Sequence, residues 1–223
     1  MVLEGLRRRV APYLERLSRP YLAWRPDSLS WLAFGLLAAA AVLSGLAHWA
    51  GPWVFLPVAA LIFVGGTFDV LDGEVARRTG RASPRGDFLD HVLDRYADTV
   101  LLLGIAASGF AIPLLALLAL ASLLLTSYMG TQAQAVGQGR LYAGLLTRAD
   151  RLVLLCLAAL LEFLWTIPWP WAPQMPFARF ALAGVSFTVI DVVLAYFVIA
   201  GQWTAFSRAR AVWHRLAPPP PLR

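Results

Sequence analysis

Long apolar segments constrain the fold of this chain more than any other feature. At about 1.5 Å of helical rise per residue, each is long enough to cross a hydrocarbon core of about 30 Å. The 223-residue chain is also 59% hydrophobic and only 14% charged, unlike a soluble domain. We therefore predict an all-α, polytopic integral membrane protein with six transmembrane helices, at about 29–48, 52–72, 86–108, 110–135, 150–168 and 177–204.

The first 25 residues differ from these segments because arginines alternate with apolar residues at helical spacing. Such a pattern predicts an amphipathic helix that lies at the membrane interface. The arginine-rich stretch is too long for a signal-peptide n-region, so we expect no cleaved targeting segment. The expected parts are the N-terminal amphipathic interfacial helix (1–25), a six-helix membrane domain (26–208) and a cytoplasmic tail (209–223).

All 19 basic residues are arginines, and the net charge is +6. Nucleic-acid binding would be one interpretation of this charge. The arginines, however, lie in short connections between apolar segments, where positive charge fixes membrane orientation. Nearly all of them fall on one side if both termini share that side. We therefore predict cytoplasmic termini, an active site on the cytoplasmic side, and no nucleic-acid partner.

Aspartates cluster where the second segment ends and the third begins. Asp69 and Asp72 are three residues apart, and Asp90 and Asp94 are four apart, so each pair projects from one helix face. Like charges this close need a counter-charge, and Mg²⁺ or Mn²⁺ would supply it with the oxygen ligands these ions prefer. The three histidines and the single cysteine are scattered, which disfavours zinc. The spacing thus predicts a hard-metal site.

Small residues and an arginine accompany these acids. Gly73 and Gly86 lack side chains, so a ligand or a neighbouring helix can approach their backbone closely. Ala76 is small in the same way. Arg77 shares a helical face with the first two aspartates, and its planar guanidinium suits a phosphate group.

Together these residues resemble the signature of the CDP-alcohol phosphotransferase family, also called CDP-alcohol phosphatidyltransferases. All eight fixed positions and their spacings are present: Asp69-x-x-Asp72-Gly73-x-x-Ala76-Arg77, eight residues, then Gly86-x-x-x-Asp90-x-x-x-Asp94. Proteins of this family have six transmembrane helices and are commonly homodimers. The resemblance therefore implies a membrane enzyme that transfers a phosphoryl-linked group from a CDP-alcohol to an acceptor alcohol and releases CMP.

The resemblance also implies roles for individual residues. Two Mg²⁺ or Mn²⁺ ions would be held by the four aspartates, the first by Asp69, Asp72 and Asp90, the second by Asp69, Asp90 and Asp94. Asp94 would be the general base on the acceptor hydroxyl. The CDP site would comprise Asp69, Asp72, Gly73, Ala76, Arg77 and Gly86. Pro26 to Ser30 resembles the family's entry to the first helix, which implies a role on the cytidine side; the alternative is that Asp27 or Ser28 caps this helix.

Three further segments resemble the branch of this family that makes phosphatidylinositol phosphate or archaetidylinositol phosphate. They are 88–98, Ser127-Tyr128 and Arg148-x-x-Arg151. The branch implies a CDP-lipid donor and inositol phosphate as acceptor, but residues 129–134 lack the basic residues that bind the acceptor phosphate there. Two interpretations stay open for Arg140, Arg148 and Arg151: they bind the phosphate of the acceptor, or they are cytoplasmic anchors.

Several alternatives stay open at this point. Glycerol phosphate or serine could be the acceptor, and a soluble CDP-inositol could be the donor. An ion transporter lined by acidic residues would be a function of another class. The charged residues Arg95, Asp98 and Asp191 lie in or near spans, where we expect an Arg95–Asp98 or an Arg95–Asp191 ion pair.

Overall fold

The computed structural model describes residues 12–139, 144–166, 180–182 and 185–216, and confirms an all-α fold to which one short hairpin is added. Residues 12–18 are helical. The other elements are η1 (Arg19–Tyr21), α2 (Pro26–Ala50), η2 (Pro52–Val54), α3 (Phe55–Arg78), α4 (Pro84–Ala107), α5 (Pro113–Ala135), α6 (Arg148–Thr166), β1 (Phe180–Leu182), β2 (Val185–Phe187) and α7 (Val189–Leu216).

Four helical stretches in the described part of the chain are long and apolar enough to cross a membrane. They are Pro26–Ala50, Pro52–Arg78, Pro113–Ala135 and Val189–Leu216. The protein is therefore a multi-pass membrane protein. Helices α4 and α6 contain more charged residues and are not among these four. That they also cross the membrane, which would make six crossings, stays a prediction.

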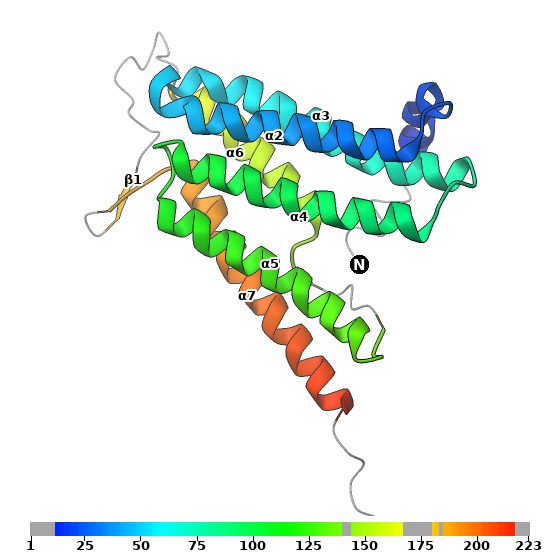
Figure 1. Cartoon of the computed structure of the whole chain (residues 1–223). Coiled ribbons are helices and arrows are strands. Elements are labelled where there is room, and N and C mark those ends of the chain that lie inside the picture. The colour runs from blue at the N-terminus through cyan, green and yellow to red at the C-terminus, as the bar shows by residue number, and fades with distance from the viewer. Residues whose placement is uncertain (1–11, 140–143, 167–179, 183–184, 217–223) are drawn as a thin grey trace, which may run out of the picture.

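The long helices form two groups, α2–α4 and the pair α5–α7, which contact each other through α4 and through α6. Helix α2 packs against both α3 and α4, while α5 packs against α7; α6 contacts α3 and α7, and α4 contacts α5. In Figure 1, α2, α3 and α4 run side by side, whereas the α5–α7 pair diverges from α4 toward the C-terminal ends of α5 and α7. A side chain at Gly104 would overlap the carbonyl oxygen of Ala41, so this glycine sets how closely α2 and α4 approach.

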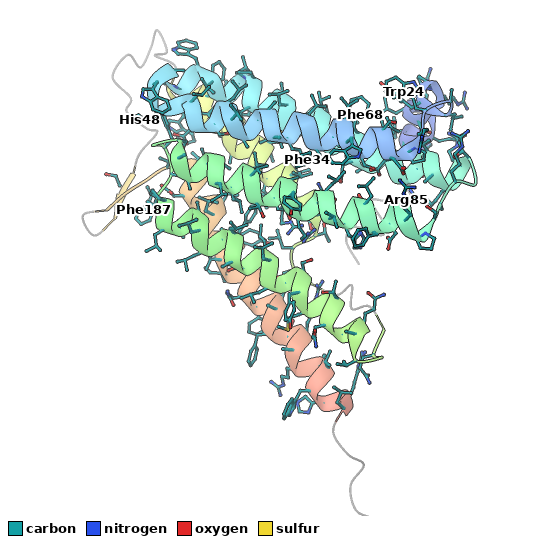
Figure 2. All side chains as sticks on the ribbon, in the orientation of Figure 1. Trp24, Phe34, His48, Phe68, Arg85 and Phe187 are labelled. Atoms are coloured by element: carbon teal, nitrogen blue, oxygen red, sulfur yellow. The ribbon has the colours of Figure 1, made fainter. Side chains whose placement is uncertain are left out.

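Both ends of the α2–α4 group can be followed in Figure 2. Trp24 and Arg85 lie at one end, and His48 lies at the other. The chain passes from one end to the other with each helix. The N-termini of α2 and α4 and the C-terminus of α3 therefore share the end that contains Arg85.

The residues before α2 dock on that same end of α3. Arg78 Nη1 donates hydrogen bonds to the backbone oxygen of Glu15 and to Ser18 Oγ, both at 2.8 Å. The ring of Tyr21 packs edge-on against Trp24 and Phe68, with centroid distances of 5.6 and 5.4 Å. Residues 1–11 of the expected amphipathic helix lie outside the described residues, and its position at the interface stays a prediction.

The sixth predicted segment began too early. Strands β1 and β2 pair antiparallel, with Phe180 opposite Phe187, and α7 starts only at Val189. Asp191 fixes this start because its Oδ2 accepts hydrogen bonds from the Thr188 amide at 2.9 Å and hydroxyl at 3.0 Å. Its Oδ1 accepts another from the Ile112 amide at 2.7 Å. Asp191 is thus a local cap rather than a partner of Arg95.

Candidate active site

Three of the predicted metal ligands converge where α3 ends and α4 begins. Asp69 on α3 and Asp90 and Asp94 on α4 each place a carboxylate oxygen within 4.8 Å of the other two. The four-residue spacing on α4 brings Asp90 and Asp94 to one helix face, as expected from helix geometry. Three converging carboxylates are a donor set that fits a hard divalent ion.

Asp72, the fourth predicted ligand, lies outside this group of three. It is buried, and its Oδ2 accepts a hydrogen bond of 2.5 Å from the hydroxyl of Ser30. Ser30 lies in the first turns of α2, so this contact joins the start of α2 to the end of α3. The sequence pattern treated Ser30 as part of the helix entry, and its contact with Asp72 could not be read from spacing.

A cavity of 220 Å³ opens between the ends of α2, α3 and α4. We call it the α2–α4 cavity. It is lined by five of the six residues predicted to bind CDP, all except Asp69, and by Asp27, Ser30 and Asp90 at its edges. The five predicted residues are Asp72, Gly73, Ala76, Arg77 and Gly86.

The start of α4 forms part of this cavity's wall. Ser83 caps the helix by accepting a hydrogen bond from the Gly86 amide at 3.1 Å. Arg77 is held by Glu74 at 2.9 Å on the opposite wall, and a side chain at Gly73 would meet the Arg77 guanidinium at 3.2 Å. A helix N-terminus and a guanidinium that face the same space favour a phosphate group.

A second cavity, of 270 Å³, lies on the other side of Asp94, where α5 and α7 diverge from α4. We call it the α4–α7 cavity. Its α5 wall is uncharged, whereas four arginines line it from the other helices. Residues that line it include Asp94, Arg95, Ser127, Gly130, Thr131, Arg148, Arg151 and Arg208.

An ion-pair network connects this cavity to the carboxylates. Arg148 Nη1 lies 2.8 Å from Asp69 Oδ1 and also contacts Asp94 Oδ1. Arg151 Nη2 lies 3.2 Å from Asp98 Oδ2. Arg95 lies 3.5 Å from Asp94 and 3.8 Å from Asp98, which agrees with the expected Arg95–Asp98 pair.

Sequence reasoning assigned no site role to two of the residues that line the α4–α7 cavity. Arg208 on α7 donates a 2.7 Å hydrogen bond to the Thr126 carbonyl, although its position in the sequence suggested only a cytoplasmic anchor. His91 lies with Nδ1 3.6 Å from Asp90. His91 directly follows Asp90 in the sequence, whereas no local pattern links Arg208 to the aspartates. Arg140, the third candidate for acceptor binding, lies outside the described residues.

The two cavities and the carboxylates between them suit a transfer between two polar molecules. Asp90 borders the α2–α4 cavity, and Asp94, one helical turn later, borders the α4–α7 cavity. A charged diphosphate would fit in the α2–α4 cavity, and an anionic acceptor would fit beside the arginines of the α4–α7 cavity.

Comparisons with known proteins agree with this geometry. The family model described as CDP-alcohol phosphatidyltransferase matches residues 24–194. The archaetidylinositol phosphate synthase of Methanothermobacter thermautotrophicus is 31% identical over 211 residues, which cover 95% of this chain and 92% of that protein. The phosphatidylinositol phosphate synthase of Cutibacterium acnes is 30% identical and covers 90% of each chain.

Solved structures show the same fold. The crystal structure of Mycobacterium tuberculosis phosphatidylinositol phosphate synthase (PgsA1) with CDP-DAG bound has a TM-score of 0.66 and 23% identity, and the match covers 97% of this chain and 98% of that one. A structure of the same enzyme in complex with manganese and citrate also has a TM-score of 0.66.

Proposed function

Because this chain belongs to the CDP-alcohol phosphatidyltransferase family, we propose that it transfers a phosphatidyl- or archaetidyl-type group from a CDP-lipid to a hydroxyl of inositol phosphate and releases CMP. The observation that carries this proposal is the position of the carboxylates between two polar cavities. One cavity is lined by residues that the family signature assigns to the nucleotide, and the other is lined by four arginines, which suit an anion. The reaction would belong to phospholipid biosynthesis.

The donor occupies the α2–α4 cavity in this proposal. Arg77 binds the diphosphate, and the positive end of the α4 helix dipole favours its charge, while Gly73, Ala76 and Gly86 leave room for it beside the backbone. Asp27 and Ser30 lie at the α2 edge of the same cavity. The CDP-DAG bound to the M. tuberculosis enzyme supports a CDP-lipid as the donor.

The aspartates hold divalent metal. Asp69, Asp90 and Asp94 supply converging oxygen ligands, and Asp72 is held nearby by Ser30. Two Mg²⁺ or Mn²⁺ ions, when bound, would neutralise the diphosphate and the departing CMP. The manganese complex of the M. tuberculosis enzyme supports the use of such an ion.

Asp94 acts as the general base. It faces the α4–α7 cavity, so its carboxylate can remove the proton from an acceptor hydroxyl placed there. The acceptor oxygen then forms a bond to the β-phosphorus of the donor, and the bond from that phosphorus to the oxygen of the CMP phosphate breaks. No covalent enzyme intermediate is needed in this scheme.

The acceptor side favours a phosphorylated molecule. Arg148 and Arg151 line the cavity, and the Nε atom of each has no hydrogen-bond partner among the described residues. These donors fit a phosphate, while the hydroxyls of Ser127 and Thr131 opposite fit an alcohol. Inositol phosphate has both groups. Glycerol phosphate shares them, whereas serine has no phosphate and is the weaker candidate.

The orientation and assembly belong to the same proposal. The arginines of the α3–α4 connection and of the start of α6 lie at the end of the protein that contains both cavities. Positive charge favours the cytoplasmic side, so both cavities and both termini face the cytoplasm. All six long helices cross the membrane, and the protein forms a homodimer as its family commonly does.

A direct assay tests the proposal. The purified protein in detergent is given CDP-diacylglycerol or CDP-archaeol with Mg²⁺ or Mn²⁺, and CMP release is measured with inositol phosphate, glycerol phosphate, inositol and serine. We expect metal-dependent CMP release with a phosphorylated acceptor only. Equal rates with inositol and inositol phosphate would contradict the assigned acceptor, and metal flux into liposomes without CMP release would favour transport.

A further inference from the structure

A fifth aspartate, Asp98, lies behind the α4–α7 cavity without lining it. It follows Asp94 by about one turn of α4 and is 6% exposed. It is not one of the three converging carboxylates, nor does it belong to the family signature described above. The chemistry proposed for the site therefore leaves this buried charge without a role.

The contacts of Asp98 are with two arginines that do line the cavity. Its Oδ2 lies 3.2 Å from Arg151 Nη2 and 3.8 Å from Arg95 Nη1. Among the described residues, Arg151 forms its ion pair with Asp98 alone, whereas Arg95 also pairs with Asp94. The position of Arg151 thus depends on one carboxylate.

Burial makes this dependence strong. The Arg151 side chain is only 6% exposed, and a buried guanidinium without a counter-charge is costly. Asp98 engages the Nη2 end of the guanidinium. The Nε atom is buried and has no hydrogen-bond partner among the described residues, so this donor is left for a ligand in the cavity.

We infer that Asp98 is a positioning residue for the acceptor, and that its carboxylate holds Arg151, and with it Arg95, in the orientation that binds the acceptor's anionic group. The inference rests on the proposed function because it takes the α4–α7 cavity as the acceptor site. Asp98 itself contacts neither substrate and acts through the two arginines.

The substitution Asp98→Asn separates this role from a purely structural one because it removes the charge and keeps the shape. We expect the KM for inositol phosphate to rise about tenfold, as for the loss of one charge-assisted contact. The KM for the CDP-lipid and kcat should each change less than threefold. A KM for the acceptor that stays unchanged, or an equal rise in both KM values, would overturn the inference.

A double-mutant cycle shows whether the effect passes through Arg151. Arg151→Gln alone should also raise the acceptor KM about tenfold. If Asp98 acts through Arg151, Asp98→Asn should add less than a twofold change on the Arg151→Gln background, because coupled residues are not additive. Fully additive effects would show that the two residues act separately.

Asp191→Asn is the matched control because Asp191 is also a buried carboxylate, is only 1% exposed and lies outside both cavities. It should lower thermal stability and leave the acceptor KM unchanged. If Asp98→Asn does not fold, Asp98→Glu replaces it: the charge is kept but moved by one methylene. The acceptor KM should then still rise selectively, and an unchanged value would reject the inference.

The experiment distinguishes failure of this inference from failure of the proposed function. A folded wild-type protein that releases no CMP with any acceptor would refute the proposed function. An active wild-type protein with an acceptor KM insensitive to Asp98→Asn would leave that function in place and refute only the positioning role.

Discussion

Arg148 contacts two of the residues that we propose as metal ligands, Asp69 and Asp94. A guanidinium at this position competes with a divalent ion for the same carboxylate oxygens. It also lines the α4–α7 cavity, which we propose as the acceptor site and where an anion would draw the guanidinium toward itself. In the proposed scheme, Arg148 therefore connects the metal site to the acceptor site.

Removing this guanidinium should strengthen metal binding. We expect Arg148→Gln to raise the affinity for Mn²⁺ about tenfold, because a positive charge next to the ligands is lost. Isothermal titration calorimetry without substrates measures the change. Arg85→Gln is the control, since it removes the same charge from the same end of the protein without lining either cavity. Weaker Mn²⁺ binding by Arg148→Gln would contradict the assignment.

Arg77 should act on the donor rather than on the acceptor. It lines the α2–α4 cavity and is held by Glu74 at its wall. Because a Lys ammonium cannot reproduce a planar two-pronged contact with phosphate, Arg77→Lys should raise the KM for the CDP-lipid about tenfold. Steady-state kinetics with each substrate varied in turn provides the test. A change in the acceptor KM alone would contradict a donor-site role for Arg77.

The sequence predicted the helical elements better than the contacts between them. The third segment, 86–108, matches α4 within two residues at each end; hydropathy missed the start itself, where Ser83 caps the helix and Pro84 is its first residue. The sixth segment, 177–204, began well before α7 because apolar composition alone does not reveal a hairpin or the Thr188–Asp191 cap. Hydropathy describes how apolar a stretch is, and the cap depends on a polar pair.

The site was predictable to a similar degree. Spacing on α3 and α4 indicated which residues share a face, and the structure does bring Asp69, Asp90 and Asp94 together. Spacing could not show that Asp72 is held by Ser30, or that Arg208 on α7 reaches the α4–α7 cavity. Those contacts depend on how separate helices pack, which a pattern along one helix does not contain.

The close packing of α2 against α4 gives a test of the elements themselves. Gly104→Ala places a methyl group where the backbone of Ala41 lies, so we expect the melting temperature to fall by at least about 2–4 °C. Gly35→Ala on α2 is the matched control because nothing lies within 4 Å of the added methyl group. It should leave stability unchanged or raise it slightly. Equal losses for both would contradict the assigned α2–α4 contact.

At the scale of the whole molecule, the charge distribution predicts the orientation in the membrane. Cysteines at Ala50 and Gln134 would lie at opposite ends of the protein, after replacement of the single cysteine, Cys156, by serine. A thiol reagent that does not cross membranes should label Ala50→Cys in intact cells and Gln134→Cys only after the membrane is opened. Labelling of both positions from outside would contradict the proposed topology.

The central claim about the whole molecule is that the end containing Arg85 is divided into two cavities, one for the donor and one for the acceptor. Donor and acceptor would enter from different helix pairs and meet at the carboxylates between them. Because Asp94 alone among the proposed metal ligands lines the α4–α7 cavity, the proposed acceptor site, its loss should affect the chemical step more than donor binding.

CMP release by wild-type protein and by Asp94→Asn, with CDP-lipid, Mn²⁺ and inositol phosphate, is the measurement that tests this claim most directly. Thermal unfolding and binding of the CDP-lipid are measured in parallel. We predict acceptor-dependent CMP release that falls by about 10²–10⁴-fold in the variant, while folding and donor binding are retained. A folded Asp94→Asn protein that releases CMP at the wild-type rate would contradict the account.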